Sequence, residues 1–292
     1  MKLAFALAAT IAWMGCDIDA ARPGSSSSSG GGGDDGSDPA DDPGNVPVPV
    51  PGTGPVTDVS GTITASTTWK DTIHIIDSVT IAQGVTVTVA PGTVVNVEVT
   101  LHGALAVQGT LDIQGTKAAK VMFQSAVAAT YWSDITVPPG GVMTASYLVQ
   151  TGGGLTITGS GKATLVDTQM SHVRGDFLTM SGGTLDMTYS AIGLDVGRDT
   201  IHCDMHVGNS PIIKASHSNI TAASFGIMFY GGINADFTYD NWFGNTNDFW
   251  FTAGPPISGD ISYSYFAKGA PTNAGLTATN MATARVADAG PR

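Results

Sequence analysis

The sequence is poor in charge and in cysteine, and its apolar segments are short. Charged residues make up 12% of the 292 residues, and there are only two cysteines, too few for a disulfide-stapled fold. The apolar run at residues 3–14 is shorter than the ~20 residues that a membrane-spanning helix needs. No window has the i, i+3, i+4, i+7 apolar spacing of an amphipathic helix. These absences favour a fold built from strands.

Basic residues are scarce as well. From Pro55 onward there are ten Lys and Arg and seventeen Asp and Glu, which gives a net charge of −7. Such a surface lacks the basic footprint of a nucleic-acid-binding protein, so we expect no nucleic-acid partner. What the chain does have is glycine, at 38 positions, and long stretches in which Thr, Ser and Val alternate. This composition suits strands joined by tight turns.

The first 15 residues have the pattern of an export signal. A lysine at position 2 precedes the apolar run of residues 3–14, as in the n- and h-regions of a signal peptide. Residues 13–16 (Trp-Met-Gly-Cys) resemble a bacterial lipobox, although their first two positions depart from its pattern. The resemblance implies that Cys16 is lipidated and holds the exported protein at the cell envelope or outer membrane surface. Ordinary cleavage after Ala20 or Ala21 is the alternative.

Residues 16–54 have the composition of a disordered Ser/Gly/Asp/Pro tether. They contain almost no apolar side chains before Val46, so they cannot bury enough surface to offset the entropy of ordering. The Val-Pro repeats at residues 46–51 favour an extended, polyproline-like segment. We therefore predict a signal peptide at 1–15, a tether at 16–54, one folded domain at 55–267, and a C-terminal cap or disordered tail at 268–292.

A short motif recurs six times in the second half of the chain. It consists of a small polar residue followed two positions later by an apolar one, and its copies lie 19–28 residues apart. The columns one, three and five positions upstream are small or apolar, and the columns between them are polar. This alternation predicts one inward and one outward face, with the motif's first residue outward and the preceding tyrosines and histidine inward. The first residues of the motif are Ser146, Ser171, Ser190, Ser218, Asp240 and Ser264.

Stacking such rows in parallel buries a continuous core, as solenoid proteins require. The two-residue turns of an antiparallel β-sandwich are scarce in this half of the chain. The earlier half has Gly-Thr turns at residues 92–93 and 109–110, then Phe-Gln-Ser at 123–125 and Trp-Ser-Asp-Ile at 132–135. This succession resembles the opening coils of secreted bacterial right-handed parallel β-helix proteins. The resemblance covers residues 59–267 and implies an all-β, single-stranded right-handed β-helix (a β-solenoid) of about nine coils.

The resemblance is informative about fold and not about activity, because the family includes adhesins, lyases and hydrolases. One polar column, four positions upstream of the motif, suggests a site. Carboxylates on adjacent coils would lie ~5 Å apart, close enough to share a Ca²⁺ ion. With a nearby base this would resemble the calcium-dependent polysaccharide lyases. The alternative is a solvated surface, and the chain lacks the Gly-His-Gly and Arg-x-Lys signatures of related enzymes. The candidate metal ligands are Asp167, Asp186, Asp236 and Asp260, and the candidate bases are Arg174, Arg198 and Lys214.

A second candidate site is the segment at residues 202–206 (His-Cys-Asp-Met-His). On a strand, His202, Asp204 and His206 would share one face, and two imidazoles with a carboxylate are a zinc-type ligand set. The alternative is two surface histidines beside a buried Cys203. The tripeptide at residues 174–176 (Arg-Gly-Asp) matches an integrin-binding motif, but a turn that needs glycine explains it.

Three functions remain open at this point. The first is a monomeric, lipid-anchored surface protein without catalytic activity that binds glycan, matrix or an envelope protein through its lateral face. The second is a polysaccharide-acting enzyme, a Ca²⁺-dependent lyase or a glycoside hydrolase, that uses the Asp column. The third is a structural spacer. We expect no cofactor for the first and third functions, and Ca²⁺ for the second if the Asp column binds a cation.

Overall fold

The computed structural model describes residues 50–98, 104–128, 130–193, 201–251 and 257–292. Cys16, the predicted signal peptide, nearly all of the predicted tether and Arg198 lie outside the described residues. Every regular element within the described ranges is a β-strand, so the predicted all-β class is confirmed. The described residues include no helix with the length and apolar character needed to cross a membrane.

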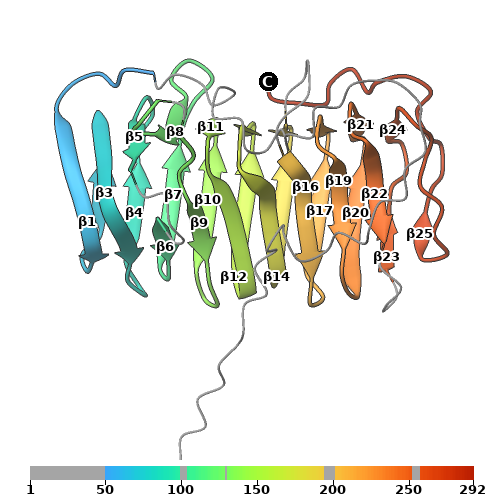
Figure 1. The fold of residues 1–292 in the computed structure, drawn as a ribbon, viewed down its shortest axis with the longest axis horizontal. Helices are drawn as coiled ribbons and strands as arrows, with labels where there is room; N and C mark the ends of the chain where they lie inside the picture. Colours follow the sequence, from blue (N-terminus) through green and yellow to red (C-terminus); the bar gives the residue numbers. More distant parts are fainter. Residues whose placement is uncertain (1–49, 99–103, 129, 194–200, 252–256) are drawn as a thin grey trace, which may run out of the picture. The chain divides into compact units, whose positions relative to one another are not determined.

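The strands follow one another around a parallel β-solenoid, with each coil hydrogen-bonded to the next. Successive coils lie side by side from β1 to β25 in Figure 1. Four long strands, β1, β3, β12 and β14, bend and contribute to two faces each. Their bounds are Val56–Ile63, Thr72–Ile81, Gly154–Val166 and Gly175–Thr188.

The other strands fall on three faces, which we name by a polar residue that each carries. The Asp face contains β2 (Thr67–Trp69), β4 (Thr86–Val89), β7 (Thr110–Gln114), β10 (Val142–Ser146), β17 (Ile212–Ser216), β20 (Ile233–Thr238), β23 (Ile257–Asp260) and β25 (Leu276–Thr277). The Asn face contains β5 (Val94–Val97), β8 (Val121–Ser125), β11 (Leu148–Thr151), β13 (Gln169–Ser171), β15 (Ala191–Ile192), β18 (Asn219–Thr221), β21 (Asn241–Phe243) and β24 (Tyr265–Phe266). The His face contains β6 (Leu105–Val107), β9 (Asp134–Val137), β16 (Ile201–Gly208), β19 (Phe225–Phe229) and β22 (Asn247–Phe251).

A single outward column on the Asp face fixes the number of coils. Its members pair in parallel register from one coil to the next, and we call it the Asp column. It has one member in each of nine coils, which agrees with the predicted number, and Asp260 pairs onward with Thr277 of β25. The column consists of Thr68, Thr88, Asp112, Thr144, Thr164, Asp186, Lys214, Asp236 and Asp260.

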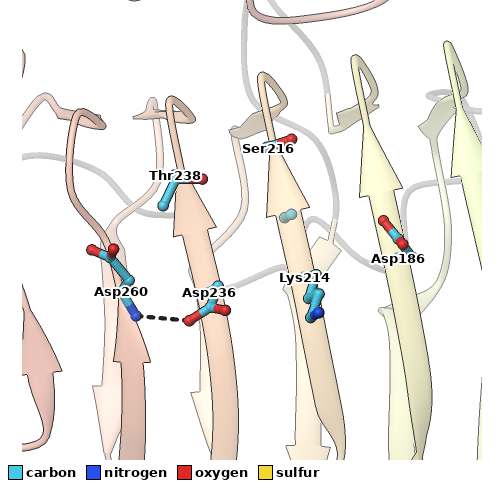
Figure 2. Close-up of a pocket in the computed structure, with 7 residues that line it drawn as sticks. Asp186, Lys214, Ser216, Asp236, Thr238 and Asp260 are labelled. Carbon is cyan, nitrogen blue, oxygen red and sulfur yellow. Dashed lines mark hydrogen bonds between the residues drawn. The ribbon is translucent and has the colours of Figure 1, made fainter.

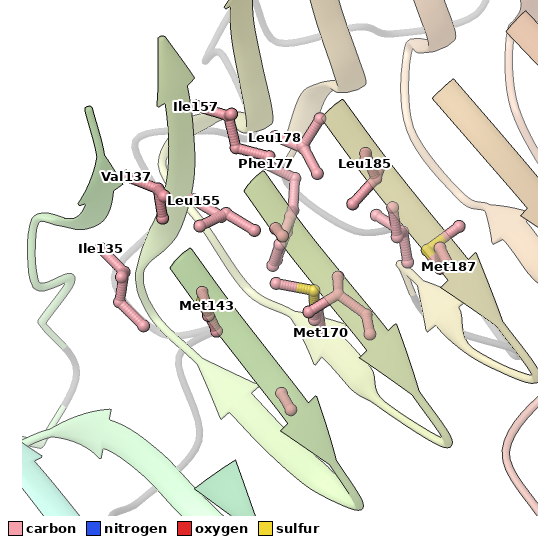
Figure 3. Close-up of a cluster of buried hydrophobic side chains, with 14 of the residues drawn as sticks. Ile135, Val137, Met143, Leu155, Ile157, Met170, Phe177, Leu178, Leu185 and Met187 are labelled. Carbon is pink, nitrogen blue, oxygen red and sulfur yellow. The ribbon is translucent and has the colours of Figure 1, made fainter. Parts of the chain in front are cut away.

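The core fills the interior of the coils. Strands such as β4, β9 and β10 alternate buried and part-exposed residues, as expected when one side of each strand faces inward. Aliphatic and methionine side chains from all three faces meet there, among them Ile135, Met143 and Leu185 (Figure 3). Full burial of each such side chain stabilises the fold by about 1.5–3 kcal/mol.

The predicted register is correct for four of the six rows and wrong for two. Side chains in the same column of successive coils are linked to backbone N–H groups. The N–H of each residue donates to the side-chain oxygen of the residue in the next coil, in the order Thr168, Ser190, Ser218, Asp240 and Ser264. Thr168 therefore occupies the place in the column that had been assigned to Ser171. In the preceding coil, Ser146 lies two residues before the position that belongs to this column. The Thr/Ser-rich alternation matches itself at more than one offset, so the sequence pattern alone did not fix these two rows. We call Thr168, Ser190, Ser218, Asp240 and Ser264 the hydroxyl column.

The hydroxyl column is buried, whereas the tyrosines before it are partly exposed, the reverse of the prediction. Ser218, Asp240 and Ser264 are fully buried, and Tyr239 and Tyr263 remain 39% and 40% exposed. The reason is a corner of the coil: Tyr239 and Tyr263 have φ of 61° and 63°, in the left-handed region. A left-handed residue turns the chain and interrupts the two-residue alternation, so the residue after each tyrosine points inward instead of outward.

The residues after β25 return along the Asn face. Asn241 exchanges two hydrogen bonds with the backbone of Val286, and the N–H of Gly290 donates to the carbonyl of His217. The segment reaches Asp167, where the Arg292 guanidinium donates to both carboxylate oxygens at 2.9 and 2.8 Å. The C-terminal segment thus covers part of the Asn face and leaves the Asp column uncovered.

Candidate functional site

The Asp column contains the first candidate site. Asp186, Lys214, Asp236 and Asp260 lie on four consecutive coils, in β14, β17, β20 and β23 (Figure 2). They line a shallow, open hollow of about 310 Å³ together with Ser216 and Thr238. This volume is at the lower end of the ~300–1,000 Å³ of small-molecule sites, and the hollow is open to solvent, so it suits part of an extended ligand better than an enclosed one.

Two carboxylates of the hollow are held by backbone groups. Asp236 accepts a hydrogen bond from the N–H of Asp260 at 3.0 Å, and Asp260 accepts one from the N–H of Ser262 at 2.8 Å. Asp186 and Lys214 are more exposed. Because Lys214 lies between Asp186 and Asp236 along the column, its charge offsets part of their repulsion. The hollow therefore presents carboxylates and hydroxyls whose remaining lone pairs can accept hydrogen bonds from a ligand.

Asp167 does not belong to this column. Thr164 occupies the corresponding position in its coil, and Asp167 sits at a corner with φ of 50° and a nearly fully buried side chain. Hydrogen bonds from Arg292 hold the pKa of Asp167 below its ordinary value, although burial opposes them. The assignment of Asp167 as a cation ligand is thus corrected, because both of its oxygens are bound by Arg292.

The structure does not bring Arg174 to the hollow. Arg174 immediately precedes the first half of β14, which pairs with β16 on the His face, whereas Asp186 lies in the second half, which pairs with β17 on the Asp face. Arg198 lies outside the described residues. Among the described residues that line the hollow, Lys214 is the sole basic side chain.

The second candidate site is a cluster around Asp176 on the His face. The carboxylate of Asp176 lies 2.9 Å from Nδ1 of His202 and 2.8 Å from Nδ1 of His206. The Cys203 thiol donates to Oδ1 of Asp176 over 2.8 Å. His202 and His206 were both predicted to contribute to a site, and the structure joins them through Asp176 on the preceding coil. The predicted carboxylate, Asp204, is fully buried.

Asp176 is anionic in this arrangement. Burial favours its neutral form, but hydrogen bonds from His202, His206 and Cys203 together outweigh burial and hold the pKa of Asp176 well below its ordinary value. The sequence contained one signal of its position, the Arg-Gly-Asp turn: Gly175 has φ of 81°, which glycine adopts readily. The hydrogen bonds that Asp176 accepts from His202 and His206 span 26 and 30 residues. They depend on the register between coils, which cannot be inferred from the local sequence pattern.

Comparison of the chain with protein-family models, with curated proteins and with solved structures finds no match.

Proposed function

We propose that this chain is an exported, lipid-anchored surface protein whose solenoid binds polysaccharide through the Asp face without cleaving it. The observation that carries the proposal is the Asp column, which no other described segment covers and in which hydroxyl and charged groups repeat once per coil. Parallel strands place these groups ~4.8 Å apart, a spacing comparable to the width of a sugar ring. A linear polysaccharide lying along the solenoid axis would meet a hydrogen-bonding group at each ring.

The charge of the column favours a polysaccharide that contains amino sugars. Three of the four charged groups in the hollow are carboxylates, and the chain from Pro55 onward carries seven more acidic than basic residues. Like charges repel acidic polysaccharides, whereas ammonium groups would form charge-assisted hydrogen bonds with the carboxylates. The acidic tether predicted at residues 16–54 would hold this face away from the membrane surface.

A non-catalytic function is supported by the sequence, which lacks the Gly-His-Gly and Arg-x-Lys signatures of related enzymes. Polysaccharide lyases and hydrolases need a positioned acid or base. The described lining residues include three carboxylates and Lys214, so a search for cleavage products is needed to separate binding from catalysis. The alternative function is a Ca²⁺-dependent lyase that uses Asp236 and Asp260, and it predicts turnover of acidic polysaccharides. The binding experiment below distinguishes it from the non-catalytic function.

The test measures binding of the full chain to soluble chitosan, to a neutral β-glucan and to polygalacturonate with and without Ca²⁺. We expect chitosan to bind, and Asp186→Asn with Asp236→Asn to weaken binding about tenfold through loss of two surface charges. Asp71→Asn with Asp77→Asn is the matched control, because it changes the net charge equally on early coils and should leave binding intact.

No reducing ends or unsaturated products should appear in these mixtures. The proposal is overturned if chitosan does not bind, or if both double variants bind as the parent does. Cleavage of polygalacturonate in Ca²⁺ that is lost in Asp186→Asn with Asp236→Asn would establish the lyase instead.

A further inference from the structure

Consecutive residues His202 and Cys203 converge on one carboxylate oxygen, an unusual arrangement on a strand. Adjacent strand residues normally point to opposite sides of a sheet. Here the register between β14 and β16 shifts: Gly175 pairs with Ile201, and Asp176 pairs with Cys203, so that one extra residue, His202, is accommodated in β16. Bulges of this kind re-aim side chains and occur near functional sites.

The three side chains offer a nitrogen, a sulfur and an oxygen ligand in one place. His202, Cys203 and Asp176 each present a ligand atom, and these three atoms all lie within 4.8 Å of one another. Imidazole with thiolate is a donor set for Zn²⁺ and related transition-metal ions, whereas Ca²⁺ and Mg²⁺ require oxygen ligands. From the residues that the structure describes, we propose that Asp176, His202 and Cys203 form a binding site for a divalent transition-metal ion of the Zn²⁺ class.

Two hydrogen bonds to one oxygen of Asp176 hold the three ligand atoms close together. His202 Nδ1 and the Cys203 thiol both lie at hydrogen-bond distance, 2.9 and 2.8 Å, from Asp176 Oδ1. In a tetrahedral zinc site, ligand atoms are separated by about 3.5 Å, as follows from bonds of ~2.0–2.3 Å. Side-chain movements of under ~1 Å would therefore admit the ion. Binding releases one proton from the thiol, and a second one if both nitrogens of His202 carry protons.

The surroundings of the cluster resemble the second shell of a metal site. Nδ1–H of His206 donates to the other oxygen of the Asp176 carboxylate at 2.8 Å, which fixes the orientation of the carboxylate. The ring of His206 is stacked on Tyr230 at 4.4 Å, and the ring of His202 contacts Phe225 edge-on at 5.5 Å. Cys203 is fully buried, whereas the side chain of His202 is 44% exposed, so an ion can reach the cluster from the His202 side.

This site is independent of the Asp column. It lies on the His face, and its ligand set selects a different class of ion from the one that carboxylates alone would hold. Failure of polysaccharide binding and failure of metal binding can therefore be told apart, because each is measured with its own probe and its own variants.

The test is titration of the full chain, carrying Cys16→Ser so that Cys203 is its sole thiol, with Zn²⁺ and with Co²⁺ as a spectroscopic substitute. We expect one ion per chain, proton release on binding, and a thiolate-to-Co²⁺ charge-transfer band in the near ultraviolet. Cys203→Ser should abolish the band, and His202→Ala, at an exposed position, should weaken binding ~100-fold or more because a direct ligand is lost.

Two further variants separate ligation from general effects. His206→Gln should weaken binding ~10–100-fold, as second-shell changes do, but should keep the charge-transfer band. His74 is the matched control, because it lies between Asp58 and Glu98 at 3.1 and 3.0 Å without a thiol, so His74→Ala should bind as the parent does. The proposal is overturned if the folded parent shows no charge-transfer band, or if His202→Ala binds Co²⁺ with unchanged affinity.

Discussion

Asp240 differs from the other members of the hydroxyl column, because it places a carboxyl where its neighbours Ser218 and Ser264 have hydroxyl groups. Its side chain is fully buried. Oδ1 accepts a hydrogen bond from the N–H of Ser218 at 2.7 Å, but Oδ2 has no partner among the described residues. Burial raises the pKa of Asp240 well above its ordinary value, and the hydrogen bond from Ser218 offsets only part of this effect. Asp240 therefore lowers the stability of the folded protein under conditions in which its carboxyl ionises.

The sign of the pH dependence follows from this shift. The folded state binds the Asp240 proton more tightly than the unfolded state, so this group lowers the stability of the protein as pH rises above the ordinary carboxyl pKa. Replacement with serine, which occupies the same column in adjacent coils, keeps an acceptor for Ser218 and removes the cost. We expect Asp240→Ser to raise the free energy of unfolding at pH 7 by about 1 kcal/mol.

Thermal unfolding of parent and variant between pH 3 and pH 8 measures this difference. The gain should shrink to zero below about pH 4, where the carboxyl is protonated in both states. Ser264→Ala is the control: it removes the acceptor used by the N–H of Asp240 and should destabilise the protein at every pH. A gain for Asp240→Ser that did not change with pH would contradict a buried carboxyl as its cause.

At the scale of the element, the left-handed corners decide which side chains face inward. Tyr189, His217, Tyr239 and Tyr263 all have positive φ and stack on one another with ring centroids 4.7–5.0 Å apart. The Arg292 guanidinium lies 3.7 Å from the centroid of the Tyr189 ring. Because their faces contact neighbouring rings, these aromatics stabilise the corners and do not form an open platform for a sugar.

Substitution at Tyr239 separates backbone strain from ring stacking. A non-glycine residue in the left-handed region costs ~1–2 kcal/mol, and glycine avoids this cost while losing ~0.5–1 kcal/mol of unfolded-state entropy. Both Tyr239→Ala and Tyr239→Gly lose the stacked ring. We expect the glycine variant to be the more stable of the two, by about 0.5 kcal/mol, in denaturant unfolding.

Tyr131, which precedes the Asp134–Val137 strand β9 and has no positive φ, provides the control. There, glycine should be no better than alanine. If Tyr239→Ala were instead more stable than Tyr239→Gly by ~0.5–1 kcal/mol, the corner backbone would carry no strain.

The corners also explain how much of the architecture could be predicted. Alternation within a strand is local, so the core positions of strands such as β10 and β20 could be assigned from the sequence. The alternation does not show where a tyrosine adopts positive φ. The side chains that follow each corner were therefore predicted to point outward, whereas they point inward. The path of the C-terminal segment depends on Asn241 and Asp167, polar residues with no distinguishing local pattern.

At the scale of the whole molecule, register between coils determines which polar residues meet. The predicted stacking of four residues was correct because the rows that contain them had been aligned with the correct offset: Asp186, Lys214, Asp236 and Asp260. Asp167 was included by mistake, because its row had been aligned with the wrong offset. The Asp176 cluster could not be predicted, since its members lie on different coils and depend on a bulge in β16. The register between coils, more than the composition of the chain, determines which residues form the candidate sites.

The proposed function makes the Asp column an extended binding face that runs along successive coils. The most direct measurement is the affinity of the full chain for chitosan oligomers of increasing length, by calorimetry. Our account predicts that the Kd falls with each added sugar as further coils are contacted, and that Asp186→Asn with Asp236→Asn removes most of this gain. Undetectable binding at every length, or a Kd that is the same for a single glucosamine and for the longest oligomer, would contradict it.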